Sequence, residues 1–196
     1  MYEMLRNYIN EITTSEISND EFKLIEQAFS LKVMKKKQFL LHEGTICKYM
    51  SFILKGALRQ YRIDDKGVEH IVRFGIEGWW MSDRQSFMML TPSKYNIEAI
   101  EDCELLVTTN EQLAQLTERS PSFLKMAHVL DQRNYIATEE RMQVTLSHTA
   151  EERFIYLLNS YPAFLQRFPQ TMLASFLGIT PETFSRVRKQ VISGRS

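Results

Sequence analysis

The chain has 196 residues, enough to bury a hydrophobic core in one domain or two small ones. Its 44% hydrophobic and 24% charged residues are ordinary for a globular protein, and no apolar run is long enough for a transmembrane helix. No charged-then-apolar leader opens the sequence, so we expect a cytoplasmic protein with no membrane partner. Cys47 and Cys103 have no CxxC spacing, which excludes a four-cysteine metal site and favours two buried apolar side chains.

The net charge of zero hides an uneven distribution of charged residues. Residues 1–110 carry 14 basic and 16 acidic groups, and residues 111–148 carry 4 and 5. Residues 149–196 carry 6 basic and 3 acidic groups, a balance of +3. A positive excess at one end suits a module that binds phosphates, although an excess of this size only supports other evidence.

In chain order, the first expected element is an amphipathic helix opened by a capping box at Ser18–Glu21. From about Lys32 the pattern changes to short strand-like runs separated by turn residues. Asp64–Gly67, between two of these runs, predicts a hairpin. The best runs are Gln38–Leu41, Ser51–Lys55, Ala57–Ile63, Val68–Phe74, Asn96–Ala99 and Cys103–Thr108. Many short strands with glycine between them favour an antiparallel barrel or jelly roll.

A long helix is expected from Pro121 to about Leu146, with Ser120 as its N-cap. A seven-residue seam, apolar except at two positions, follows one face of this helix: Phe123, Ala127, Leu130, Asn134, Ala137, Arg141 and Val144. Because the helix is longer than needed to cover the barrel, the seam favours a coiled-coil-like homodimer. The alternative is that the seam packs within one chain.

A second capping box at Thr149–Glu152 predicts another helix, which runs through Leu158. We therefore predict an α+β chain in three parts. These are an antiparallel β-roll (jelly-roll) sensor domain over residues 1–120, a long dimerisation helix over 121–147, and an all-α helix-turn-helix domain over 148–196.

The segment Gln170–Lys189 has the length of two short helices and the turn that joins them. Gly178 suits the positive φ of a sharp turn, Thr180 can cap the second helix, and Pro181 fits its first position. The inward positions are all apolar: Leu173, Leu177, Ile179, Phe184 and Val187. This agreement predicts a DNA-binding helix-turn-helix. The alternative is a helical hairpin with a solvated charged face.

The outer face of the second helix carries groups that can contact DNA. Glu182, Arg186 and Lys189 follow each other at i, i+4 and i+7 and form one stripe. Arginine can donate two hydrogen bonds to guanine, and glutamate can accept one from cytosine, whereas Arg188 and Lys189 are expected to contact phosphates. The expected DNA-binding residues are Gln170, Thr180, Glu182, Thr183, Ser185, Arg186, Arg188 and Lys189.

The segment Gln170–Arg186 closely resembles the DNA-binding segment of the Crp/Fnr family of bacterial regulators. Phe39–Gly44 and Phe52–Gly56 resemble that family's cyclic-nucleotide-binding-type β-roll, and the long helix matches its dimerisation helix in placement. The resemblance implies a transcription regulator rather than an enzyme, with double-stranded DNA, a second copy of the chain and RNA polymerase as candidate partners. It implies two DNA half-sites about 34 Å apart, with Glu182 and Arg186 as the base-reading residues.

The sequence departs from the family pattern in the phosphate-binding cassette. In the family's cyclic-AMP binders, a glutamate accepts from the ribose hydroxyl and an arginine pairs with the cyclic phosphate. Asp83 stands at the first position, one carbon shorter than glutamate, and Ser93 stands at the second, followed by Lys94. We therefore expect no cyclic-AMP binding and no cofactor. An unidentified small-molecule effector is expected to contact Trp80, Asp83, Arg84 and Lys94.

Two other functions stay open. A small-molecule sensor with a vestigial helix-turn-helix could signal through a protein partner. The sequence ends seven residues after Lys189, which leaves no room for a wing and predicts weaker DNA binding.

A cupin-type enzyme could use a related jelly roll. The four histidines have neither HxH nor HExxH spacing, which argues against that metal site: His42, His70, His128 and His148.

Overall fold

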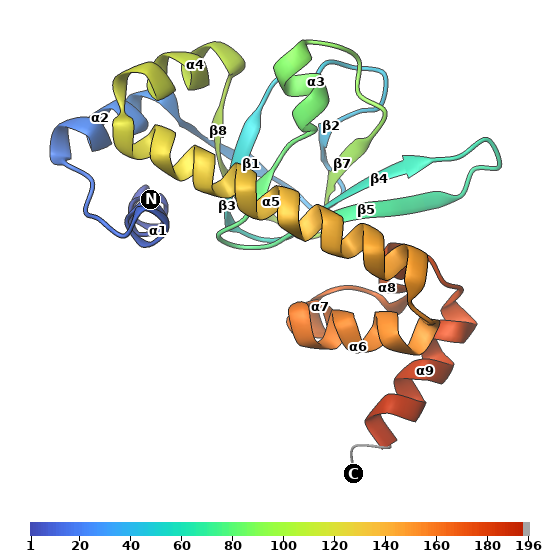
Figure 1. Ribbon diagram of the computed structural model, residues 1–196. Helices are drawn as coiled ribbons and strands as arrows, with labels where there is room; N and C mark the ends of the chain where they lie inside the picture. Colours follow the sequence, from blue (N-terminus) through green and yellow to red (C-terminus); the bar gives the residue numbers. More distant parts are fainter. Residues whose placement is uncertain (194–196) are drawn as a thin grey trace. The chain divides into compact units, whose positions relative to one another are not determined.

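The computed structural model describes residues 1–193 and divides into two compact units (Figure 1). The first unit comprises Met1–Arg62 and Val72–Gln132. The second comprises Ile63–Ile71 and the chain from Arg133 onward. This division falls inside the long helix and groups the tip of one hairpin with the C-terminal helices. The domain boundaries at residues 120 and 147 stay a prediction.

Two helices precede the sheets, α1 (Glu3–Thr13) and α2 (Asn19–Ala28). Ser18 caps α2 as predicted, because its hydroxyl accepts from the Glu21 amide at 3.2 Å. The Glu21 carboxylate does not return a bond to the cap residue's amide. It instead accepts from the Ser120 hydroxyl and the Ser122 amide, each at 3.0 Å. Glu21 therefore connects α2 to the start of the long helix.

The strands form two four-stranded sheets, with the orders β1-β8-β3-β6 and β2-β7-β4-β5. The pairs β1–β8, β3–β8, β2–β7 and β4–β7 are antiparallel. Ile53 and Leu105 from the first sheet share one buried cluster with Leu58 and Ile97 from the second. The strands are β1 (Ser30–Met34), β2 (Phe39–Leu41), β3 (Met50–Lys55), β4 (Leu58–Ile63), β5 (Glu69–Gly75), β6 (Trp80–Met81), β7 (Asn96–Ala99) and β8 (Cys103–Thr108). The predicted antiparallel β-roll is confirmed.

The turn between β4 and β5 is the predicted hairpin. Gly67 has a φ of 80° and its amide donates to the Asp64 carbonyl at 2.9 Å. The Asp64 amide donates to the Val68 carbonyl at 3.0 Å, which closes the turn. Glycine is needed here because other residues rarely adopt a positive φ.

The remaining helices are α3 (Arg84–Met89), α4 (Asn110–Arg119), α5 (Pro121–Ser147), α6 (Ala150–Ser160), α7 (Phe164–Arg167), α8 (Gln170–Leu177) and α9 (Pro181–Ser193). Ser120 caps α5, and Thr149 with Glu152 forms the complete capping box of α6, as predicted. Within residues 1–193, no helix is long and apolar enough to cross a membrane. The same residues contain no group of three or more His, Cys, Asp or Glu side chains placed to hold a metal ion.

Candidate nucleic-acid interface

The helices α8 and α9 are joined by the tight turn that the sequence predicts. Gly178 ends α8 in the left-handed conformation, with a φ of 66°. The Ile179 amide returns to the Ala174 carbonyl at 3.0 Å, which satisfies a carbonyl at the end of α8. Thr180 caps α9 because its hydroxyl accepts from the Thr183 amide at 3.2 Å. Residues of the turn itself therefore fix the end of α8 and the start of α9.

A small core holds the two helices together. Leu173 and Leu177 of α8 and Phe184 and Val187 of α9 are all buried, as predicted. The Phe184 ring packs edge-on against Phe154 of α6, with 5.4 Å between the ring centroids. Because this core uses the inner face of α9 alone, the outer face of that helix is left for other contacts.

The outer face of α9 presents the predicted polar stripe. Glu182, Arg186 and Lys189 are exposed, as are three further predicted DNA contacts, Gln170, Thr180 and Ser185, while Thr183 and Arg188 are half-buried. A hydrogen bond from its own amide and another from the Thr180 hydroxyl lower the pKa of the Glu182 carboxyl. The carboxylate is therefore ionised at neutral pH and acts as an acceptor only.

An open hollow of about 600 Å³ lies beside this stripe, lined by Gln170, Ser185, Arg188, Lys189, Ile192 and Ser193. It combines two cations with the first turn of α8. Pro169 precedes α8 and provides no side-chain cap, while its carbonyl accepts from the Met172 and Leu173 amides at 3.0 and 3.1 Å. The earlier amides of the helix, of Gln170 and Thr171, can therefore bind an anion. Four of these lining residues are predicted DNA contacts. Ile192 and Ser193 were not predicted, because they lie after the segment Gln170–Lys189.

Arg153 of α6 was not anticipated by the sequence analysis. Its guanidinium donates to the Leu177 carbonyl at 3.0 Å, the Thr145 carbonyl at 2.6 Å and the His148 carbonyl at 3.1 Å. It therefore joins the C-terminal ends of α8 and α5, where a positive charge is favourable. A capping box had marked the start of α6, but nothing in the sequence relates Arg153 to these carbonyls.

Two of the residues predicted to contact an effector or stand in the cassette, Asp83 and Ser93, are hydrogen-bonded to each other. The Ser93 hydroxyl donates to Asp83 Oδ2 at 2.7 Å, and Asp83 also caps α3 by accepting from the Ser86 amide. Asp83 is 6% exposed and Ser93 is 4% exposed, so this bond is shielded from water. Asp83 and Ser93, the residues that the sequence predicts to stand at the ribose and phosphate positions, are therefore hydrogen-bonded to each other.

The other predicted effector contacts have separate surroundings. Arg84 forms an ion pair with Asp131 of α5 at 2.6 Å, and Lys94 is exposed. The Trp80 ring packs in an aromatic cluster, with its centroid 5.1 Å from that of Phe52 and 6.4 Å from that of Phe123. Trp80 is therefore half-buried and packs against the hydrophobic core of the first unit.

Several residues of the predicted seam of α5 pack within the chain, as in the alternative that the sequence left open, and the dimer interface itself stays a prediction. Phe123 is 1% exposed in the core of the first unit, and Leu130 packs against the same cluster. Arg141 lies over the Phe176 ring at 3.9 Å, and Val144 is buried. Asn134 is exposed, while Ala127 and Ala137 are half-buried. A buried side chain such as Phe123 has almost no surface to offer to a second copy.

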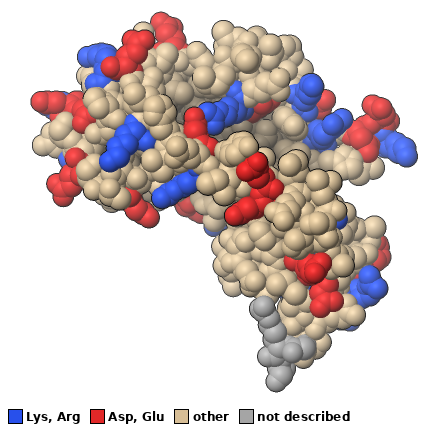
Figure 2. Space-filling model, in the orientation of Figure 1, with Lys and Arg blue, Asp and Glu red and all other residues tan. Residues whose placement is uncertain are grey.

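A different face of α5 carries exposed apolar side chains. Leu124, Tyr135, Met142 and Leu146 are 37%, 65%, 59% and 78% exposed. Their spacings of eleven, seven and four residues place them on one side of the helix. Elsewhere, basic and acidic side chains are interspersed over the surface in view (Figure 2).

Comparison with known proteins agrees with this geometry. Residues 31–120 match the cyclic nucleotide-binding domain family. The chain is 26% identical over 167 residues to the transcriptional activator protein Anr of Pseudomonas aeruginosa, which covers 79% of this chain and 67% of Anr.

Two solved structures share the fold. FixK2 from Bradyrhizobium japonicum has a TM-score of 0.71 at 19% identity, and the match covers 85% of each chain. The catabolite activator protein of Thermus thermophilus has a TM-score of 0.56 at 20% identity, covering 93% of this chain and 87% of that one. Residues 31–120 therefore form a domain of the cyclic nucleotide-binding family, and the chain is similar in sequence to the transcriptional activator Anr and in fold to FixK2.

Proposed function

We propose that the protein is a homodimeric transcription regulator that binds DNA sequence-specifically through α8 and α9, and that it is not an enzyme. The observation that carries this proposal is the exposed stripe of Glu182, Arg186 and Lys189 on a helix whose opposite face is buried. Arg186 and Glu182 are one helical turn apart and can reach neighbouring base edges in a major groove. The first amides of α8, with Arg188 and Lys189, supply phosphate contacts.

A mobility-shift assay with fragments of the protein's own genome tests this proposal. Arg186→Ala removes a two-bond base contact and should cost about 1–3 kcal/mol of binding free energy at the selected site. The matched control is Arg133→Ala, which removes an exposed arginine from α5. A shift that Arg186→Ala leaves unchanged would contradict base reading by Arg186, and no selective shift at low salt would contradict DNA binding. The latter result, with a ligand-induced thermal shift, would favour a sensor that signals through a protein partner.

We also propose that a second copy covers the exposed face of α5 with Leu124, Tyr135, Met142 and Leu146. The helix has 27 residues, long enough for two copies to pair along several turns. Side chains as large and exposed as Tyr135 and Leu146 lose unfavourable hydration when a partner covers them. We favour this face over the predicted seam, because Phe123, Leu130 and Val144 of that seam already pack within the chain.

We further propose that the sensor does not bind cyclic AMP. The Asp83 carboxylate, held by Ser93, would bring a negative charge close to an anionic cyclic phosphate, and no arginine stands at the phosphate position. A ligand at a hundred times its Kd stabilises a protein by about 2.7 kcal/mol, which a thermal-shift assay detects. Cyclic AMP and cyclic GMP should cause no shift. A clear shift with either would overturn this proposal, and a metabolite panel in the same assay would search for another effector.

A further inference from the structure

One histidine stands on the side of α5 that is proposed to pair with a second copy. His128 follows Leu124 by four residues and precedes Tyr135 by seven, and this spacing places the three on the same side of the helix. Its side chain is exposed, and it forms no hydrogen bond or ion pair with any residue that the structure describes. Met126 and Val129, on the other side of the helix, contact the core of the first unit. The imidazole of His128 is therefore free to meet a second copy.

The proposed dimer brings two His128 side chains together. In each copy α5 leads into α6, and the helix-turn-helix follows (Figure 1). Two helix-turn-helix segments that read neighbouring half-sites of one duplex belong at the same end of the dimer, so we expect the two α5 helices to run parallel. In a parallel pair of identical helices, a residue on the inner side faces its own copy. His128 therefore faces the partner's His128.

The other charged groups near His128 are held by contacts within the first unit. Lys125 Nζ donates to a carbonyl at the end of α1 at 2.7 Å. Asp131 forms its ion pair with Arg84 of α3 at 2.6 Å, so its negative charge is already balanced. Glu21 of α2 accepts from two hydroxyls and an amide at the start of α5, about two turns before His128. Each of these carboxylates already has a donor, and neither is free to balance a positive charge on His128.

We propose that His128 makes dimerisation sensitive to pH: the interface forms with neutral imidazoles and weakens when both are protonated. The inference rests on the proposed function as a homodimer that pairs along α5. Histidine changes its charge between pH 5 and 8. Because the dimer favours the neutral form, its affinity is full above the pH at which the imidazole titrates in the separate chains and is lost as the pH falls through that range.

The size of the effect follows from the repulsion of two like charges. Two unit charges about 6 Å apart, at an effective dielectric constant of about 20, repel by an energy that corresponds to about a hundredfold in an equilibrium constant. Water and salt reach an exposed site and reduce this value. We therefore expect the Kd of the dimer to rise about tenfold between about pH 8 and about pH 5.5.

Sedimentation equilibrium of the full chain at these two pH values tests the inference, with circular dichroism to show that the chain is folded at both. His128→Gln keeps a polar side chain that does not titrate, and its dimer should have the same Kd at both pH values. His128→Lys carries a positive charge at both, and its dimer should be weak at both. The matched control is His42→Gln, which removes an exposed histidine from the turn after β2 and should keep the pH dependence of the wild type.

Three results would overturn the inference. A wild-type Kd that is equal at the two pH values shows that the interface does not respond to protonation. A pH dependence that persists in His128→Gln shows that another group titrates. A His128→Lys dimer as tight as the wild type at about pH 8 shows that the two copies of residue 128 do not meet. A folded wild type that is monomeric at both pH values overturns the proposed homodimer as well, which distinguishes the two failures.

Discussion

Replacing Arg153 with methionine should destabilise the C-terminal helices by about 2–4 kcal/mol. The guanidinium donates to three main-chain carbonyls, and a net contribution of about 1.5–3 kcal/mol is typical of a hydrogen bond that involves a charged group. The sum is an upper bound, because Arg153 is half-buried and water can replace part of each bond. Favourable placement at two helix C-termini contributes about 0.3–1 kcal/mol more. Because methionine keeps most of the apolar part of the arginine side chain, the loss of stability measures the contribution of the three hydrogen bonds.

Native-state hydrogen exchange measures this effect helix by helix. Amides of α8 and α9 should exchange faster in Arg153→Met, while those of β3 and β8 in the other unit should not change. Arg133→Met removes an exposed cation from α5 and should stay within about 0.5 kcal/mol of the wild type. If Arg153→Met matches this control, the three carbonyl bonds contribute nothing to stability and the reasoning is refuted.

Three further predictions concern the cassette, the hairpin and α5. Ser93→Ala removes the donor to buried Asp83 and should lower the free energy of unfolding by about 1–3 kcal/mol, measured by urea titration; no change would refute a structural role. A hydrogen bond from His70 lowers the pKa of the Asp64 carboxyl below the ordinary aspartate value. The ionised Asp64 side chain therefore stabilises the hairpin fully above the ordinary aspartate pKa, and this stabilisation is lost as the pH falls through the lowered pKa. Val68 amide exchange should follow that loss, and Asp64→Asn should remove this pH dependence. Tyr135→Glu places a charge on the exposed face of α5 and should shift the sedimentation of the protein to that of a monomer, whereas an unchanged dimer would refute this interface.

The β-roll and the long helix could be predicted in outline because strand alternation, turn residues and caps are local signals. The helix α1 was not predicted, although Leu5 and Ile9 are fully buried in it. The role of Glu21 was also missed. The capping-box pattern identifies its position in α2, whereas its carboxylate is used by Ser120 and Ser122, which approach only after folding.

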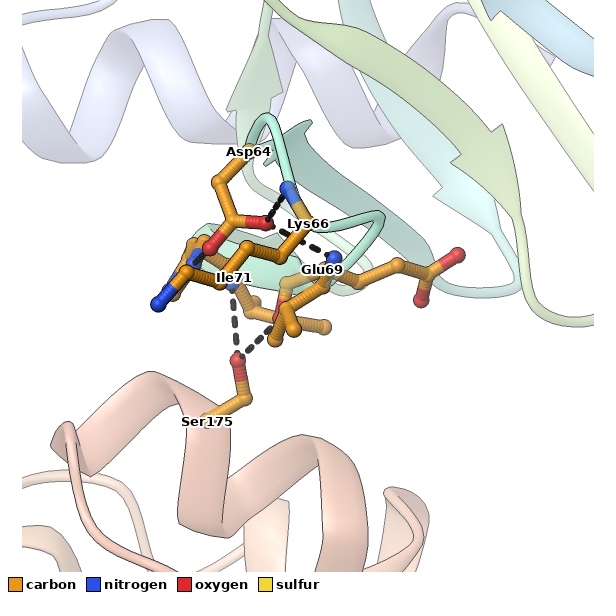
Figure 3. Close-up of polar contacts among 7 residues, drawn as sticks. Asp64, Lys66, Glu69, Ile71 and Ser175 are labelled. Carbon is orange, nitrogen blue, oxygen red and sulfur yellow. Dashed lines mark hydrogen bonds and ion pairs between the residues drawn. The ribbon is translucent and has the colours of Figure 1, made fainter.

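The sequence alone determined the helix-turn-helix, because each of its parts depends on residues a few positions apart. Gly178 turns the chain, Thr180 caps the next helix, and helical spacing separates a buried face from an exposed one. Tertiary structure decided which face of α5 is free, because a heptad pattern identifies an apolar face but not its partner, and Phe123 found its partner within the chain. It also decided the hydrogen bonds of the Ser175 hydroxyl (Figure 3), because these join it to main-chain groups of distant residues, and main-chain groups leave no mark in a sequence.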